Sequence, residues 1–259
     1  MQKVLKYKIA LIVLSLLVVS QCLFIITSRP KKAAVPPAVQ LKGKIAIVLD
    51  DWGYNLNNMD LVEGIKYPLT ASVLPGLTYS EAISDELHSR GFEIILHLPL
   101  EPQEKYRLEK NTVMVSQGEE EIRGIVTDDL SKVKFVRGVS NHMGSLATQD
   151  PRVMRVIFEE LKKRKMFFLD SFASPRSICA ELAAKVNLPF AKRNIFLDNN
   201  SDPGYIREQL HRLKMRARVK GSAIGIGHDR RNTLEVLKEV MPQIEKEGYK
   251  FVFVSELAR

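Results

Sequence analysis

Five apolar runs in this chain each end in side chains that can bind metals or carry protons. In chain order these ends are Asp50-Asp51, His97, Asn141-His142, Asp170-Ser171 and His228-Asp229. Taken singly, each has an ordinary explanation, because a carboxylate after a strand is often a helix N-cap. Together they place three of the five histidines and four carboxylates at equivalent positions. That set suits a divalent metal with imidazole and carboxylate ligands.

The runs that precede these side chains have the composition of buried strands. They are Lys44–Leu49, Ala71–Leu74, Glu93–Leu96, Lys134–Val139, Met166–Leu169, Ala191–Asn194, Ala223–Ile226 and Lys250–Val254. Near-continuous apolar runs of this kind are typical of parallel strands that are covered on both faces. Helical stretches separate them, such as Tyr79–Ser89, Pro151–Lys165 and Pro203–Val219. Pro242 is expected to break or kink the last helical stretch after Val240.

Strand and helix alternate about seven times over roughly 215 residues, which predicts an α/β fold. We expect a single domain over residues 43–259, a distorted (β/α) barrel of about seven strands. Functional side chains gather at the carboxyl ends of the strands in such a domain, so the five polar ends are predicted to share one rim. The other two histidines, His88 and His211, lie inside helical stretches and are interpreted as packed or solvated side chains.

The N-terminal segment predicts a membrane anchor. Residues 9–27 are apolar and uncharged, and 19 residues is about the length that crosses a hydrocarbon core of roughly 30 Å. Three lysines precede the run, which favours a cytoplasmic N-terminus over residues 1–8 and an exported remainder. We therefore expect a single-pass signal-anchor in the inner (cytoplasmic) membrane, a proline-containing linker over residues 28–42, and the domain on the extracytoplasmic side. Secretion after signal cleavage is the alternative.

The net charge of +9 does not indicate a nucleic-acid partner. Seven of the 39 basic residues lie in residues 1–42, which contain no acidic residue, so the remainder holds 32 basic and 30 acidic side chains. A nearly neutral domain has no need of a polyanion. Searches for a phosphate-binding Gly-Lys-Ser/Thr loop, a His-Glu-x-x-His pair and a Gly-x-Ser-x-Gly elbow are negative.

Five stretches carry a resemblance to a known family: KIAIVLDDWGYN, EIILHLPLEP, GVSNHMGS, FFLDSFAS and AIGIGHDR. In this order they resemble the motifs of the divergent polysaccharide deacetylases, from about Lys44 to the C-terminus. That family is similar to the carbohydrate esterases that deacetylate chitin oligomers and peptidoglycan. The resemblance implies a distorted βα-barrel and metal-dependent removal of an N-acetyl group from a polysaccharide, with Zn²⁺ as the expected ion.

The resemblance also implies roles for individual residues. In the esterases an Asp-Asp pair ends the first strand, so Asp50 would be the general base and Asp51 a metal ligand. His97 lies in the stretch that resembles the second esterase motif and is the next ligand candidate. His228 corresponds to the late histidine that acts as general acid, and Asp170 would orient His228 or contact the substrate. Asn141 and Ser171 are expected to bind the substrate.

The chain departs from the esterases at two places. The esterases have a second ligand histidine four residues after the first, where this chain has Glu101. They also have an Arg-x-Pro-x-Gly stretch, where this chain reads Ser140-Asn141-His142-Met143-Gly144. The arginine that tunes the base is therefore missing. We infer that His142 replaces the missing ligand, while Glu101 is the competing ligand or a group that hydrogen-bonds the substrate.

Two other functions stay open at the level of sequence. One is a glycan-binding or scaffolding protein of the envelope that keeps the site without catalysis. The other is a metal-dependent phosphoesterase in which Arg230 and Arg231 would hold the phosphate, although a solvated turn is the preferred interpretation of these two arginines.

Overall fold

The computed structural model describes residues 1–27 and 40–259, which form two compact units. One holds the helix α1 (Gln2–Thr27), and the other is a domain that contains all the remaining described elements. Helix α1 is long and apolar enough to cross a bilayer, since an 18-residue window within Gln2–Ile25 has a mean hydropathy of 2.4. The predicted linker, residues 28–42, lies mostly outside the described residues. The first strand begins at Gly43.

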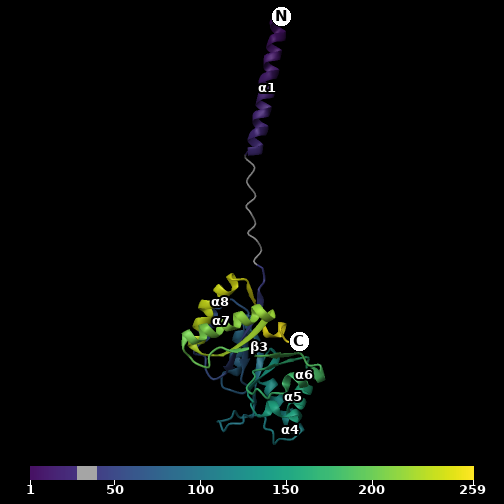
Figure 1. The fold of residues 1–259 in the computed structure, drawn as a ribbon, viewed down its shortest axis with the longest axis vertical. Coiled ribbons are helices and arrows are strands. Elements are labelled where there is room, and N and C mark those ends of the chain that lie inside the picture. The colour runs from purple at the N-terminus through teal and green to yellow at the C-terminus, as the bar shows by residue number, and fades with distance from the viewer. Residues whose placement is uncertain (28–39) are drawn as a thin grey trace. The chain divides into compact units, whose positions relative to one another are not determined.

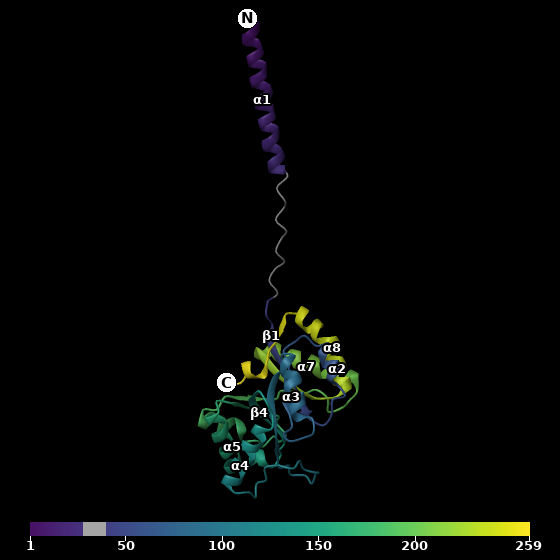
Figure 2. The same ribbon diagram turned by 180° about the vertical axis from the view of Figure 1, so that it is seen from behind.

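The domain is built on one parallel sheet that curls into an incomplete barrel (Figures 1 and 2). Its strands are β1 (Gly43–Trp52), β2 (Thr70–Val73), β3 (Glu93–Leu100), β4 (Val136–Met143), β5 (Phe167–Asp170), β6 (Phe190–Lys192), β7 (Ile195–Phe196), β8 (Ser222–His228) and β9 (Tyr249–Phe251). Eight of them follow the order β6-β5-β4-β3-β2-β1-β8-β7, and β9 pairs with the start of β1. The predicted α/β barrel is confirmed. The described sheet has nine strands where about seven were expected. Eight correspond to the apolar runs of the sequence, and the ninth, β7, is only two residues long.

The helices lie between successive strands, as the alternating pattern predicts. They are α2 (Met59–Glu63), α3 (Ser80–Ser89), α4 (Glu119–Ser131), α5 (Pro151–Lys163), α6 (Cys179–Val186), α7 (Pro203–Lys220) and α8 (Arg231–Lys246), with short 3₁₀ turns at Ala147–Gln149 and Val254–Glu256. Helix α5 begins where Asp150 accepts hydrogen bonds from two free backbone N–H groups and Pro151 occupies the first turn.

The expected break at Pro242 is wrong, because α8 continues through it to Lys246. Buried Leu237, Met241 and Ile244 lie on both sides of the proline and pack into the core. Burial of such side chains contributes roughly 1.5–3 kcal/mol each, which outweighs the loss of one helical hydrogen bond.

Two apolar clusters hold the sheet, one on each face. The larger packs the helices against residues such as Ile45, Ile47 and Trp52. The smaller covers the other face and joins Val48 and its neighbours to the C-terminal segment. Since both faces are buried, polar side chains of the strands become accessible only at the strand ends, and the carboxyl ends carry the candidate site.

Candidate metal and acid–base site

A local irregularity at the end of β1 turns both aspartates toward the same site. Consecutive side chains of a regular strand point to opposite faces, but the pairing of β1 with β2 shifts register between Leu49 and Trp52. Asp51 also has a φ of 65°, in the left-handed region, and such strained positions are frequent at functional sites. As a result, Asp50 Oδ2 lies 3.7 Å and Asp51 Oδ1 3.3 Å from His97 Nε2.

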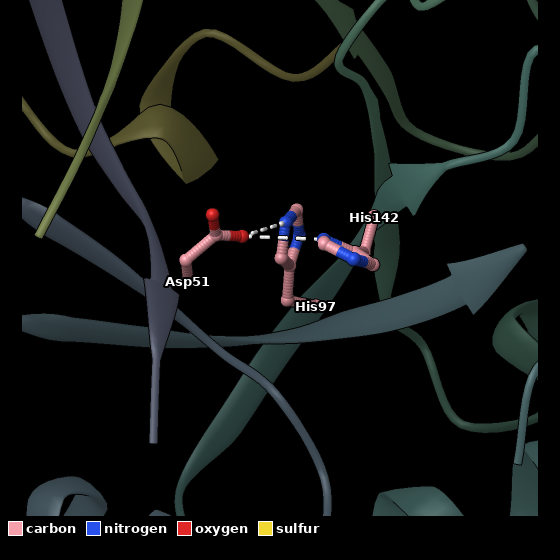
Figure 3. Close-up of side chains that lie close together, drawn as sticks. All are labelled: Asp51, His97 and His142. Carbon is pink, nitrogen blue, oxygen red and sulfur yellow. Dashed lines mark hydrogen bonds and ion pairs between the residues drawn. The ribbon is translucent and has the colours of Figure 1, made fainter. Parts of the chain in front are cut away.

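Asp51, His97 and His142 form a cluster with the composition of a metal site (Figure 3). Asp51 Oδ1 lies 3.3 Å from His97 Nε2 and 3.2 Å from His142 Nδ1. One donor atom from each residue lies within 4.8 Å of the other two. Two imidazoles and one carboxylate are the protein ligands of many catalytic zinc sites, which keep a further position for water or substrate. The side chains therefore fit a divalent ion.

Two buried serines orient the His97 ring. Ser140 Oγ lies 2.8 Å from His97 Nδ1 and 2.6 Å from Ser72 Oγ. Partners of this kind fix which imidazole nitrogen faces a metal, so here Nε2 is left to face Asp51. Sequence reasoning did not find these serines. Both are small polar residues buried within strands, and no sequence pattern predicts their contacts.

Asp50 is a buried carboxyl group with an unusual environment. Its side chain is 3 % exposed, and Oδ1 has no hydrogen-bond partner among the described residues. Burial raises the pKa of Asp50, and the charge of Asp51 adds to this rise, while His97 opposes it. A carboxylate of raised pKa beside a candidate metal site can accept a proton from water.

Asp51 behaves in the opposite way. Burial alone would raise its pKa, but the hydrogen bonds from His142 and His97 and the charges of His97 and His228 hold the pKa of this carboxyl well below its usual range. The pKa values of the adjacent aspartates are thus shifted in opposite directions. Asp51 stays ionised, as a metal ligand must, and Asp50 can take up a proton, as a base must.

Asp198 contacts and orients His228, whereas Asp170 was expected either to orient His228 or to contact the substrate. His228 Nδ1 lies 2.8 Å from Asp198 Oδ1, and the backbone N–H of His228 donates to Asp198 Oδ2 at 2.9 Å. The other ring nitrogen, Nε2, lies 3.7 Å from Asp51 Oδ2 and so faces the cluster. Burial alone would lower the pKa of His228, but the hydrogen bond and charge of Asp198 outweigh it and raise the pKa above 6.5.

Asp198 follows Leu197 at the end of β7, so it obeys the same rule as the five polar ends found in the sequence. It was missed because β7 is too short to stand out as an apolar run. Gly227 on the neighbouring β8 leaves room for Thr233, because an added Cβ would lie 3.0 Å from Thr233 Cγ2. The Thr233 hydroxyl donates to Asp198 Oδ2 at 2.7 Å.

Asp170 makes contacts of its own beside the site. Its carboxylate accepts hydrogen bonds from the backbone N–H of Phe172 and the hydroxyl of Ser177, both at 2.7 Å. The Arg193 guanidinium donates to the carbonyl oxygens of Ser171 and Phe172 at 2.5 Å and 3.0 Å. Burial lowers the pKa of Arg193, while the charges of Asp50 and Asp170 oppose that change. A cation therefore lies near Asp50 although the arginine of the esterase motif is absent.

The three predicted substrate-binding residues hydrogen-bond within the protein. Ser171 N–H donates to Asn141 Oδ1 at 2.9 Å, and Asn141 Nδ2 donates to the Met143 carbonyl at 2.7 Å, so Asn141 and Ser171 join the ends of β4 and β5. The Glu101 carboxylate accepts from Val115 N–H at 2.6 Å. The metal cluster contains His142 and not Glu101.

In the phosphoesterase alternative, Arg230 and Arg231 would hold a phosphate at the metal cluster. Among the described residues, neither arginine forms a hydrogen bond or ion pair with a residue of that cluster. Arg230 donates to the Asp198 carbonyl oxygen at 2.8 Å, and Arg231 pairs with Glu235 one helical turn away at 3.2 Å. Both contacts agree with the interpretation of these two arginines as part of a turn that leads into a helix.

Asp198→Asn is expected to lower the pKa of His228, because it removes the charge that raises this pKa. A histidine with a raised pKa is protonated below that pKa and loses its proton as the pH rises through it. The pH at which His228 loses its proton should thus fall in the variant. Titration of the imidazole resonances by NMR measures this, with Asp202→Asn at the start of α7 as control. An unchanged His228 titration would contradict the role given to Asp198.

Comparisons with known proteins identify a family and a fold. Residues 47–258 match the family model of divergent polysaccharide deacetylases. The chain is 33% identical over 201 residues to the uncharacterised protein YibQ of Escherichia coli, covering 78% of this chain and 63% of YibQ. It is 31% identical over 197 residues to an uncharacterised protein of Haemophilus influenzae, covering 76% and 70% of the two chains. The chain thus spans about two thirds of the length of these relatives.

Solved structures share the fold. An uncharacterised protein of Agrobacterium tumefaciens superposes with a TM-score of 0.78 at 20% identity, covering 89% of this chain and 92% of the other. A peptidoglycan N-acetylglucosamine deacetylase gives 0.52 at 11%, covering 85% and 89%. A Bacillus anthracis pseudoenzyme of carbohydrate esterase family 4 gives 0.50 at 14%, covering 85% and 66%. From the family match over most of its length, this chain belongs to the divergent polysaccharide deacetylase family.

Proposed function

We propose that the domain is a metal-dependent hydrolase that removes N-acetyl groups from an envelope polysaccharide or a related glycan, with Zn²⁺ as its ion. The observation that carries this proposal is the placement of Asp50 and His228 beside the cluster of Asp51, His97 and His142. Hydrolysis of an amide by this mechanism needs a base, an acid and a metal site, and candidates for all three lie at the same edge of the sheet.

Asp51, His97 and His142 would hold the ion. When bound, a divalent ion polarises a carbonyl group and lowers the pKa of water from about 15.7 to about 7. Asp50 takes a proton from the water whose oxygen attacks the amide carbon. His228, held protonated by Asp198, gives a proton to the nitrogen as the carbon–nitrogen bond breaks. The products are acetic acid, which ionises to acetate, and the free sugar amine. Asp50 ends protonated and His228 neutral, and each returns to its starting state by exchanging one proton with water.

The site lies away from the point where the chain enters the domain. The chain enters the domain at Gly43, and the site lies at the other end of β1, roughly 25 Å away at about 3.3 Å per residue. A tether that enters at the edge opposite the site leaves the site open to a polymer. We propose that α1 is a single-pass anchor in the inner membrane, and release after signal cleavage is the alternative.

A glycan-binding protein without catalysis is the second candidate. One observation favours it: Ser140 occupies the position at which the esterases have the arginine that tunes their catalytic base. Ser140 contacts His97 instead. The fold is shared with a pseudoenzyme, and another structure of that protein is described as a mutant with restored enzymatic activity.

Release of acetate distinguishes the two candidates. The full-length chain in detergent is incubated with N-acetylglucosamine oligomers, and acetate is measured before chelation, after chelation and after zinc is returned. We expect release that stops on chelation and returns with zinc. Oligomers that bind without release of acetate under any of these conditions would favour the non-catalytic candidate.

A further inference from the structure

Several exposed apolar side chains lie along the same edge of the sheet as the metal cluster. Tyr54 follows Asp51 by three residues and is 50% exposed. Tyr106, 61% exposed, and Leu108, 37% exposed, lie on the segment between β3 and α4. That segment, residues 101–118, is called the rim loop below. Large exposed side chains gathered beside a polar site are typical of binding surfaces.

Tyr54 connects the cluster to the rim loop. Its hydroxyl donates to Glu109 Oε1 at 2.5 Å, a contact between residues 55 positions apart in the chain. Burial and the Glu109 carboxylate raise the pKa of Tyr54, Asp51 adds to the rise, and Arg107 opposes it. The Tyr54 hydroxyl therefore links the segment that follows Asp51 to Glu109 of the rim loop.

The rim loop is fixed at its base and stands out from the domain (Figure 2). Glu101 closes it, because its backbone N–H donates to the Val113 carbonyl at 3.0 Å and its carboxylate accepts from Val115 N–H. Asn111 donates to Asp128 and Asp129 of α4 at 2.7 and 2.8 Å. These contacts hold the ends of the loop, and Glu109 within it contacts Tyr54.

We propose that Tyr54 and the rim loop bind the sugar residue next to the one whose amide enters the metal site. A sugar ring has an apolar face of C–H groups, which packs on an aromatic ring, and hydroxyl groups around its edge. Tyr54 supplies the ring, held in place by Glu109. Arg107 and Glu109 supply a planar guanidinium and a carboxylate that can bond to hydroxyl groups. This inference rests on the proposed function and names the residues that would select an oligomer over a single sugar.

Binding of short and long oligosaccharides tests the proposal. The full-length chain carrying Asp50→Asn is loaded with zinc in detergent, so that the ligand is not consumed. Its affinities for N-acetylglucosamine and for the tetramer are measured by calorimetry. Adding Tyr54→Ala is expected to weaken tetramer binding roughly three- to tenfold, the size of an aromatic contact, and to leave the monomer affinity unchanged. Tyr54→Phe keeps the ring and should retain most of the tetramer affinity.

Phe135→Ala is the matched control, since Phe135 is another exposed aromatic residue, 46% exposed, that precedes β4 at the opposite edge of the sheet. It should bind the tetramer as the parent does. Three results would each overturn the proposal. Tyr54→Ala could keep full affinity for the tetramer, or it could lose affinity for monomer and tetramer equally. The parent chain could also bind no oligosaccharide. Tyr54-dependent binding without acetate release would leave this proposal standing and overturn the deacetylase.

Discussion

Asp50→Asn is expected to reduce acetate release by a factor of roughly 10²–10⁴, the usual contribution of one acid–base group. The amide has nearly the shape of the carboxylate but cannot accept the proton of the attacking water. Asp50 stands outside the three-residue metal cluster, so zinc affinity should change far less than activity. Initial rates at saturating zinc, with zinc titrations alongside, measure both quantities.

Asp60→Asn on the exposed surface of α2 is the matched control, because it makes the same chemical change away from the site. It should release acetate at the parent rate. A fully active Asp50→Asn chain would show that another group accepts the proton. Equal losses of activity and zinc binding would instead identify Asp50 as a ligand.

Asp51→Ala and His142→Ala are expected to weaken zinc binding on the order of 100-fold or more. Loss of a group that only orients a ligand costs 10- to about 100-fold, and removal of the ligand itself should cost at least as much. Acetate release should be lost at zinc concentrations that saturate the parent chain. Competition with a chromogenic chelator gives the affinities.

Two further variants make this test specific. His211→Ala removes an exposed histidine of α7 and should leave zinc affinity unchanged. Glu101→Ala removes the competing candidate, whose carboxylate instead bonds to Val115 N–H. If Glu101→Ala loses zinc while His142→Ala keeps it, then the ligand assignment is reversed.

Much of the arrangement follows from a single feature of the sequence. Asp51, His97 and His142 each follow an apolar run, and parallel strands bring such ends to one edge of a sheet. The structure brings these three side chains together, although they are 46 and 45 residues apart in turn along the sequence. The apolar runs also predicted the α/β barrel, and the motifs at their ends indicated the family.

Other features depend on contacts that a local pattern does not encode. Asp198 meets His228 because β7, only two residues long, pairs with β8. Ser72 and Ser140 reach each other from strands that are not adjacent in the sheet order, with β3 between them. The left-handed conformation of Asp51 arises from the register shift between β1 and β2, which is a property of the pair of strands.

The zinc content of the full-length chain tests the metal site most directly. Chain purified in detergent is stripped with a chelator, dialysed with excess zinc and then without it, and assayed for metal by mass spectrometry. We expect one zinc ion per chain, lost in Asp51→Ala and kept in His211→Ala. A correctly folded parent chain that retains no zinc, or one that retains it equally well without Asp51, would contradict it.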